Sequence, residues 1–154
     1  MDKYEFFWKS PSVFSQWTTS YFVIDDIKYN CAEQYMMAEK ARLFNDNQTL
    51  QQILNETNPS RQKNLGRKVK NFDPKIWNQN SMDIVIKGNL NKFKQNPEML
   101  KKLLETDDKI LAEASPYDNI WGIGMLKTHK DILDKSKWGK NQLGKALMIV
   151  REKK

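Results

Sequence analysis

The chain has 154 residues, of which 39% are hydrophobic and 29% charged, and its formal net charge is +7. This length is enough for one domain with a real core, and no apolar run reaches the roughly 20 residues that a membrane span needs. The N-terminus lacks a signal-peptide pattern and the only cysteine, Cys31, excludes an intrachain disulfide, so we expect a cytoplasmic protein. His129 is the only histidine, which argues against a zinc site, and we expect no cofactor.

The first half of the chain is expected to hold short strands and then helices. Residues 6–8 are an apolar run that indicates a strand. Residues 21–24 and 27–29 flank two aspartates, which is typical of a hairpin with a tight turn. Helices are expected to follow over residues 30–41 and 47–56.

Asn-Pro and Asp-Pro pairs mark the later helix starts, because proline suits the first helical position. These pairs predict helices over residues 58–65 and 75–94, and another that begins at residue 96. A strand over residues 109–113 and a final helix over 142–151 complete the chain. The prediction is a single α+β domain over residues 1–154, mainly α-helical with a small β-sheet.

The helix over residues 30–41 carries an acid and a base on its apolar face. Glu33 and Lys40 are seven residues apart, so at about 100° per residue they fall nearly on one line. Their Cα atoms are then roughly 10 Å apart, too far for an ordinary salt bridge within a helix. A small ligand would fit between them, although long charged side chains can also reach out of an apolar face or find buried partners.

A second unusual segment lies in the last third of the chain, where glycines alternate with Trp and Asn. Such a segment suits a loop wall, where backbone amides meet a ligand and an aromatic ring stacks on it. Asp118 follows the expected strand and is a candidate acid, base or ribose-hydroxyl acceptor. The alternative is a turn-rich surface loop in which Asp118 caps a turn.

Several motifs, spread over nearly the whole chain, together resemble the NADAR family (NAD- and ADP-ribose-associated, also called YbiA-like). In chain order they are Phe14-Ser15-Gln16-Trp17, Tyr29-Asn30-Cys31-Ala32-Glu33-Gln34-Tyr35-Met36-Met37-Ala38-Glu39-Lys40, Leu65-Gly66-Arg67, Trp77, Asp118-Asn119-Ile120-Trp121-Gly122 and Gly139-Lys140-Asn141-Gln142-Leu143-Gly144-Lys145-Ala146-Leu147-Met148. One departure is Gln16, where the family commonly has asparagine, and a longer amide reshapes that edge of a pocket.

The resemblance implies an N-glycosidase with a YbiA-like fold. Family members are described in two roles: one removes ADP-ribose from the amino group of guanine in nucleic acid, and the other cleaves phosphoribosylamino-pyrimidine intermediates of riboflavin synthesis. The family's acid corresponds to Glu33, its tryptophan to Trp77 and its aspartate to Asp118. Lys40 matches the lysine that closes the family's helix motif.

Cleavage of a ribosyl C–N bond needs charge stabilisation at C1 and a proton for the departing nitrogen, and Glu33 and Asp118 are candidates for both tasks. Burial would lower the pKa of Lys40, so that its amine either attacks C1 to form a Schiff base or acts as an electrostatic anchor. The expected catalytic residues are therefore Glu33, Lys40 and Asp118. The expected substrate-binding residues are the stacking or gripping groups Trp17, Arg67, Trp77, Trp121, Gly122 and Asn141.

The partner expected from this interpretation is a substrate that carries ADP-ribose or ribose phosphate, with ADP-ribosylated DNA as one candidate and no membrane. The net charge of +7 mildly favours nucleic acid over the riboflavin intermediate. A third hypothesis is a non-catalytic module that binds ADP-ribose or another ligand derived from NAD. The sequence carries no signal for the oligomeric state.

Overall fold

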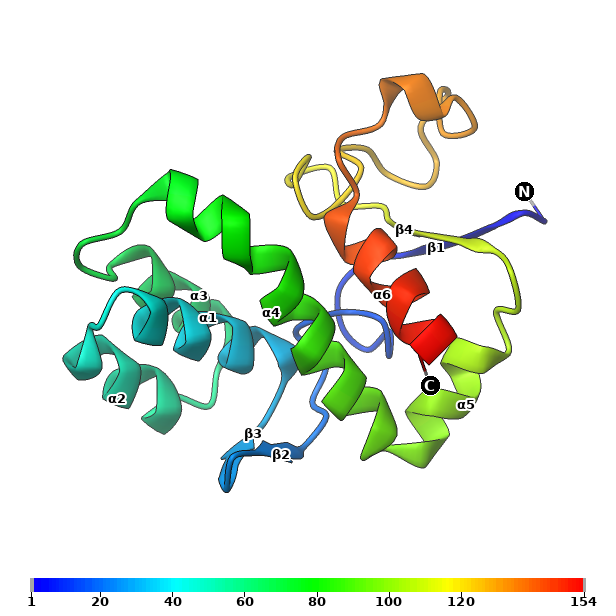
Figure 1. Ribbon diagram of the computed structural model, residues 1–154. Coiled ribbons are helices and arrows are strands. Elements are labelled where there is room, and N and C mark those ends of the chain that lie inside the picture. The colour runs from blue at the N-terminus through cyan, green and yellow to red at the C-terminus, as the bar shows by residue number, and fades with distance from the viewer. Residues whose placement is uncertain (1, 154) are drawn as a thin grey trace. The chain divides into compact units, whose positions relative to one another are not determined.

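The structure, a computed structural model, describes residues 2–153. Within that range it has six α-helices, one short 3-10 helix and four strands (Figure 1). The strands form two separate two-stranded sheets. The predicted mainly helical α+β class is confirmed, with the difference that the strands form two small sheets instead of one. None of the described helices is long and apolar enough to cross a membrane.

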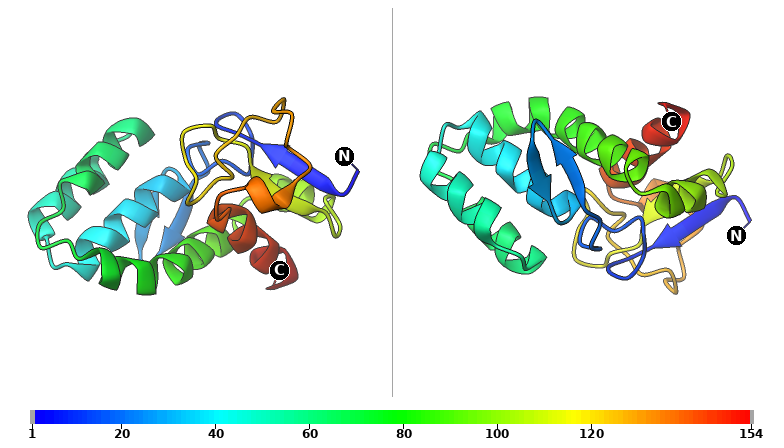
Figure 2. Two further views of the ribbon diagram at one scale, coloured as in Figure 1. Left: turned by 90° about the horizontal axis from the view of Figure 1, so that it is seen from above. Right: turned by 90° about the horizontal axis from the view of Figure 1, so that it is seen from below.

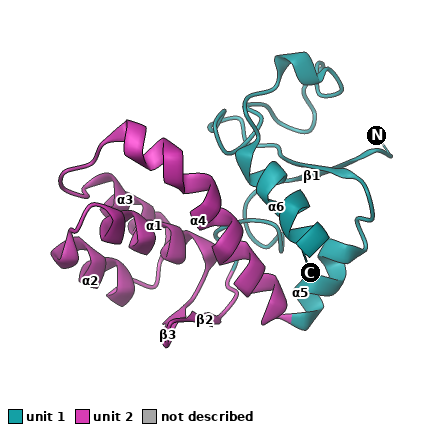
Figure 3. Cartoon of the chain, viewed as in Figure 1, with its two compact units in different colours: residues 1–18, 97–154 teal, residues 19–96 magenta. Residues whose placement is uncertain are grey.

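The chain divides into two compact units (Figure 3). Residues 19–96 make unit 2, which is continuous in sequence, and residues 1–18 and 97–154 make unit 1. The expectation of one domain over residues 1–154 stays a prediction.

Unit 2 begins with the predicted hairpin. Strands β2 (Phe22–Ile24) and β3 (Ile27–Tyr29) pair antiparallel, and the two residues between them, Asp25 and Asp26, both have positive φ. Positive φ at both central residues is the requirement of the tight turn that matches the twist of a hairpin. Figure 2 shows this ribbon of two strands beside α4 (Pro74–Lys94). Gln95, just after α4, binds β2 through both ends of its side-chain amide. Its Oε1 accepts from Val23 N at 2.8 Å, and its Nε2 donates to Val23 O at 2.9 Å.

Helix α1 (Ala32–Leu43) is the centre of unit 2. It packs against α2 (Asn47–Asn55), α3 (Pro59–Arg67) and α4. Residues 32–38 are therefore buried on every side, and not only along one stripe. Glycines allow the close approach: a Cβ on Gly66 would lie 2.0 Å from Met37 Sδ, and one on Gly88 would lie 2.7 Å from the Tyr35 ring.

The helix starts in unit 2 follow the capping chemistry of the sequence. Asp46 accepts from the N–H of Thr49 at the start of α2, Asn58 accepts from two N–H groups of α3, and Asp73 accepts from the N–H of Lys75 in α4. Proline occupies the first turn of α3 and of α4. These contacts satisfy backbone donors that have no partner within the helix, and for this reason the helix starts were predictable.

Unit 1 is built on a parallel pair of strands, β1 (Tyr4–Phe7) and β4 (Ile110–Glu113), in which Tyr4 lies opposite Ile110. Helix α6 (Gln142–Lys153) packs on β4. Helix α5 (Pro97–Leu104) directly precedes β4 in the chain. A short 3-10 helix, Lys135–Lys137, lies in the long segment between β4 and α6. A buried cluster supports that segment, with Phe6 and Trp138 packed against it: Ala112, Ala114, Ile123, Met125 and Ile132.

Candidate active site

Helix α1 carries the acid and the base of the candidate site. Glu33 lies in its first turn with 6% of its surface exposed, and Lys40 lies in its last turn, half-buried. The buried state of Glu33 follows from the packing of three helices around α1. A carboxylate is costly to bury unless other groups stabilise its charge, so this position is unusual for a residue that has only a structural role.

Two aromatic rings contact the Lys40 ammonium group. Its Nζ lies 4.6 Å from the centre of the Phe72 ring and 5.6 Å from the centre of the Trp77 ring. Phe72 comes from the loop between α3 and α4, and Trp77 from the first turn of α4. The Phe72 ring itself packs edge-on against Phe44, with ring centres 5.4 Å apart. The distances from Lys40 Nζ to the Phe72 and Trp77 rings are both within the range of a cation–π interaction.

The pKa of Lys40 lies below the ordinary value of a lysine. Burial is the main cause, because it disfavours the charged ammonium form, while the carboxylate of Glu33 opposes the shift and the guanidinium of Arg67 adds to it. The sequence argument for a lowered pKa therefore agrees with the electrostatics of unit 2. A lysine of this kind holds a larger share of free amine near neutral pH than an exposed lysine does.

Unit 2 thus brings together four of the residues expected from the sequence: Glu33, Lys40, Arg67 and Trp77. Arg67 ends α3 with its side chain exposed, and it donates to the Asn64 side chain at 3.0 Å. The cluster combines a buried carboxylate, an amine of lowered pKa, an exposed guanidinium and two aromatic faces. Such a set can hold an anionic or ribose-bearing ligand and transfer protons to and from it.

The other five expected residues belong to unit 1. Asp118 accepts hydrogen bonds from the N–H groups of Ile120 and Trp121, each at 2.9 Å, so it shapes its own loop as the turn-capping alternative predicts. Gly122 has no room for a side chain, because a Cβ would lie 2.8 Å from the carbonyl oxygen of Asp118 and 2.9 Å from that of Glu113. Trp121 is half-buried.

Trp17 and Asn141 lie in different settings within unit 1. Trp17 is 36% exposed, and its backbone N–H donates to the Ser15 hydroxyl. Asn141 is buried, and its amide joins the start of α6 to β4 by donating to Leu111 O at 2.9 Å and accepting from Glu113 N at 3.2 Å. The structure therefore shows a structural task for Asn141, and its contact with a substrate stays a prediction.

Phe72 is the residue of the Lys40 environment that the sequence analysis missed. It lies outside every helix, so helical periodicity carries no signal for it. Its placement depends on Asp46, whose carboxylate accepts from Lys70 N at 2.9 Å and so holds the loop before Phe72. Asn71, between them, adopts a left-handed backbone with φ of 62°. A contact between residues 40 and 72 is visible only in three dimensions.

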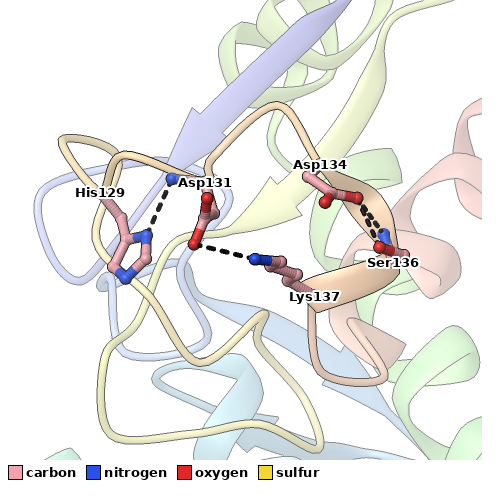
Figure 4. A network of polar contacts seen from close by, with 5 residues as sticks. All are labelled: His129, Asp131, Asp134, Ser136 and Lys137. Atoms are coloured by element: carbon pink, nitrogen blue, oxygen red, sulfur yellow. Dashed lines mark hydrogen bonds and ion pairs between the residues drawn. The ribbon is translucent and has the colours of Figure 1, made fainter.

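Cys31 and His129 have their own partners in the structure. The buried Cys31 thiol donates to the Gln62 side chain, and burial raises its pKa to about 11, which keeps it protonated. His129 is exposed, and its Nδ1 accepts from the N–H of Asp131, as Figure 4 shows. In the same loop Asp131 pairs with Lys137, and Asp134 binds Ser136. These hydrogen bonds join Cys31 and His129 to residues other than Glu33, Lys40, Arg67 and Trp77.

The class of protein that this fold and cluster define is shown by comparison with known families. Residues 6–153 match the model of the NADAR domain, so the chain belongs to the NADAR family. The resemblance read from the motifs is thereby confirmed.

Individual relatives agree with this assignment. The chain is 44% identical to an N-glycosidase of Acanthamoeba polyphaga mimivirus, over 98% of this chain and 96% of that protein. It is 30% identical to an N-glycosidase of Nostoc punctiforme, over 94% of this chain and 86% of that protein. The NMR structure of the E. coli protein YbiA matches 99% of this chain and 84% of its own, with a TM-score of 0.80 and 26% identity. The predicted YbiA-like fold is confirmed. The predicted enzyme class, N-glycosidase, is the one named for the mimivirus and Nostoc relatives.

Proposed function

We propose that this protein is an N-glycosidase that removes ADP-ribose from the amino group of guanine in nucleic acid. The observation that carries the proposal is the half-buried Lys40, held against Phe72 and Trp77 on the same helix as the buried Glu33. Membership of the NADAR family and the N-glycosidase names of two relatives support the class of reaction. The net charge of +7 favours the nucleic-acid substrate.

The reaction begins with opening of the ribose ring. The lone pair of the guanine amino nitrogen forms a C=N bond to C1 of the ribose, the bond from C1 to the ring oxygen breaks, and that oxygen takes a proton. Glu33 in its acid form is the proposed source of this proton. The product of the step is a protonated imine between ribose C1 and guanine, in which the guanine nitrogen keeps its hydrogen and C1 is open to attack by a nucleophile.

Lys40 is the proposed nucleophile. Its free amine forms a bond to C1, a proton moves from Nζ to the guanine nitrogen, and the C1–guanine bond breaks with its electron pair leaving on nitrogen. Lys40 then holds the ribose as a Schiff base. Water adds to C1 and releases both the lysine amine and ADP-ribose, and Glu33 carries the protons between these steps.

The other expected residues, apart from Asp118, are proposed to bind the substrate. Trp77 presents an aromatic face beside Lys40, and Arg67, exposed at the end of α3, suits a phosphate group of ADP-ribose. Substrate contacts are also proposed for four residues of unit 1, namely Trp17, Trp121, Gly122 and Asn141. A catalytic role for Asp118 in unit 1, as an acid, a base or a ribose-hydroxyl acceptor, stays a prediction.

Turnover of defined substrates tests the proposed function. The protein is incubated with a single-stranded oligonucleotide that carries one ADP-ribosylated guanine, and released ADP-ribose is measured by liquid chromatography and mass spectrometry. We expect release by the unaltered protein and loss of release in Glu33→Gln and Lys40→Met. Lys68→Met, which alters an exposed lysine just after α3, is the matched control and should keep full activity.

Two other outcomes would contradict the proposal. Release of ribose phosphate from phosphoribosylamino-pyrimidine, without release from the oligonucleotide, would assign the riboflavin-intermediate activity instead. Tight binding of ADP-ribose without turnover of either substrate would indicate a binding module. Borohydride reduction during turnover should attach ADP-ribose to Lys40, and turnover without any trapped adduct would leave Lys40 as an electrostatic anchor.

A further inference from the structure

Unit 1 carries an aromatic pair on its surface, built from Trp8 and Tyr117. The two ring centres are 5.9 Å apart with an angle of 53° between the ring planes. Tyr117 is 88% exposed, the largest exposed fraction among the large hydrophobic residues on the described surface. The Lys9 Nζ lies 4.5 Å from the centre of the Trp8 ring. Together Trp8, Lys9 and Tyr117 are called the Trp8–Tyr117 platform below.

The platform is fixed in place by the backbone around it. The N–H of Tyr117 donates to the hydroxyl of Ser115, which is buried after β4, and Trp8 directly follows β1. Lys9 adopts a left-handed backbone with φ of 49°, and its carbonyl accepts from Ser12 N. The two aromatic residues therefore follow two strands that pair with each other, Trp8 directly after β1 and Tyr117 in the turn after β4.

The residue that follows Tyr117 in the chain is Asp118, one of the proposed site residues. An exposed ring at this position has one face covered by little besides water, and an aromatic side chain gains free energy when such a face is covered. None of the proposed steps at ribose C1 uses Trp8, Lys9 or Tyr117. The Trp8–Tyr117 platform is therefore a candidate for binding a part of the substrate other than the ribose and its phosphates.

We propose that the Trp8–Tyr117 platform binds unpaired bases of a single-stranded nucleic-acid substrate. Every base has a flat face that stacks on an aromatic ring, and each nucleotide brings a phosphate that a lysine attracts. The cation beside the two rings and the net charge of +7 are complementary to this partner. The inference rests on the proposed function for the modified guanine, but base stacking itself is testable on unmodified DNA.

The first experiment measures binding alone. A fluorescent, unmodified single-stranded oligonucleotide is titrated with the full chain, and fluorescence anisotropy gives the dissociation constant. We expect Tyr117→Ala to weaken binding about tenfold, in line with the loss of one stacked base. Tyr117→Phe should bind as the unaltered protein does, because it keeps the ring. Lys9→Gln should lower the slope of affinity against salt by about one.

Tyr21 provides a matched control in unit 2. It is 54% exposed and has Lys28 Nζ 4.7 Å from its ring centre, so it shares the exposed ring and the cation. Its exposed ring is not part of the proposed platform. Tyr21→Ala should therefore leave DNA binding unchanged. Equal affinities of Tyr117→Ala and the unaltered protein would overturn the platform, as would an equal loss in Tyr21→Ala.

The second experiment separates the platform from the chemistry. Turnover is measured on an ADP-ribosylated oligonucleotide and on ADP-ribosylated guanosine, which has no neighbouring bases. Tyr117→Ala should lower kcat/KM about tenfold on the oligonucleotide and leave it unchanged on the nucleoside. An equal loss on both substrates would contradict the platform. Binding of DNA through Tyr117 without turnover of either substrate would overturn the proposed function and leave the platform supported.

Discussion

The carboxylate of Asp46 accepts a hydrogen bond of 2.9 Å from the backbone N–H of Lys70, 24 residues further along the chain. The same carboxylate accepts from the N–H of Thr49 at 3.1 Å and from its hydroxyl at 2.6 Å. One side chain therefore caps helix α2 and also holds the loop that leads to Phe72. This link connects the packing of unit 2 with the environment of Lys40.

Asp46→Asn should destabilise the protein in a pH-dependent way. Hydrogen bonds from Thr49 and Lys70 hold the pKa of Asp46 below its ordinary value. A carboxyl group with a lowered pKa in the folded state adds stability above its unfolded pKa of about 3.9, and that stability is lost as pH falls through the folded pKa. In urea unfolding, the free energy of unfolding of Asp46→Asn should be lower than that of the unaltered protein at pH 7. This difference should become smaller as the pH falls toward 3.

Asp134→Asn is the matched control for Asp46. The pKa of Asp134 is also lowered by hydrogen bonds, from the side chain and N–H of Ser136, but these join residues two positions apart in an exposed loop. Loss of such a local contact should change the free energy of unfolding less than loss of Asp46. A larger effect of Asp134→Asn would contradict the holding role of Asp46.

Phe72→Ala should shift the pH dependence of turnover upward. Burial is the main cause of the lowered pKa of Lys40, and removal of the Phe72 ring lets water reach the amine. The pKa of Lys40 should then rise toward its ordinary value, so a higher pH is needed for the same share of free amine. Phe72→Leu keeps the apolar cover and should retain the original profile of kcat against pH. Identical profiles for Phe72→Ala and the unaltered protein would argue against amine catalysis.

Lys92→Met should remove a rise of stability with pH. Lys92 is fully buried in α4, and burial lowers its pKa to about 7. Between pH 7 and the unfolded pKa of about 10.4, the unfolded chain binds more protons than the folded one, so stability rises by up to about 1.4 kcal/mol per pH unit. Chemical unfolding at several pH values should show this slope for the unaltered protein and a flatter one for Lys92→Met. The exposed Lys94→Met should keep the slope.

Gly88→Ala should destabilise the protein, although alanine is the better helix former by about 1 kcal/mol. A Cβ at residue 88 would lie 2.7 Å from the ring of Tyr35. That ring is buried and packs edge-on against Tyr29 and Phe22, so it has little room to move. We expect a net loss of about 1–3 kcal/mol in the free energy of unfolding. Gly66→Ala faces the flexible Met37 side chain and should cost less.

Local chemistry made most elements predictable. Caps and prolines fixed the starts of α3 and α4, and two adjacent aspartates marked the hairpin turn. The pairing of β1 with β4 was not predictable, because partners more than a hundred residues apart leave no periodic trace in the sequence. For the same reason the strands were expected in one small sheet, whereas the structure has two.

The candidate site was predictable only where residue type and helical position carry a signal. Glu33 and Lys40 are charges seven residues apart on the apolar face of the expected helix, and that mismatch is visible in one dimension. Phe72 and Asp46 act through contacts between segments, which periodicity cannot reveal. Asn141 illustrates the opposite case: a residue type typical of ligand binding forms hydrogen bonds to Leu111 and Glu113 within its own unit.

The parallel pairing of β1 with β4 also sets an order of events during synthesis. Unit 2 is one uninterrupted stretch, so all of its internal contacts are available once residue 96 has left the ribosome. The first strand, although made earliest, finds its partner only after residues 110–113 have been added. Until then its backbone donors and acceptors stay unpaired, which is a state that invites pairing with other chains. Early compaction of residues 19–96 shortens the remaining search by bringing the two ends of that stretch together.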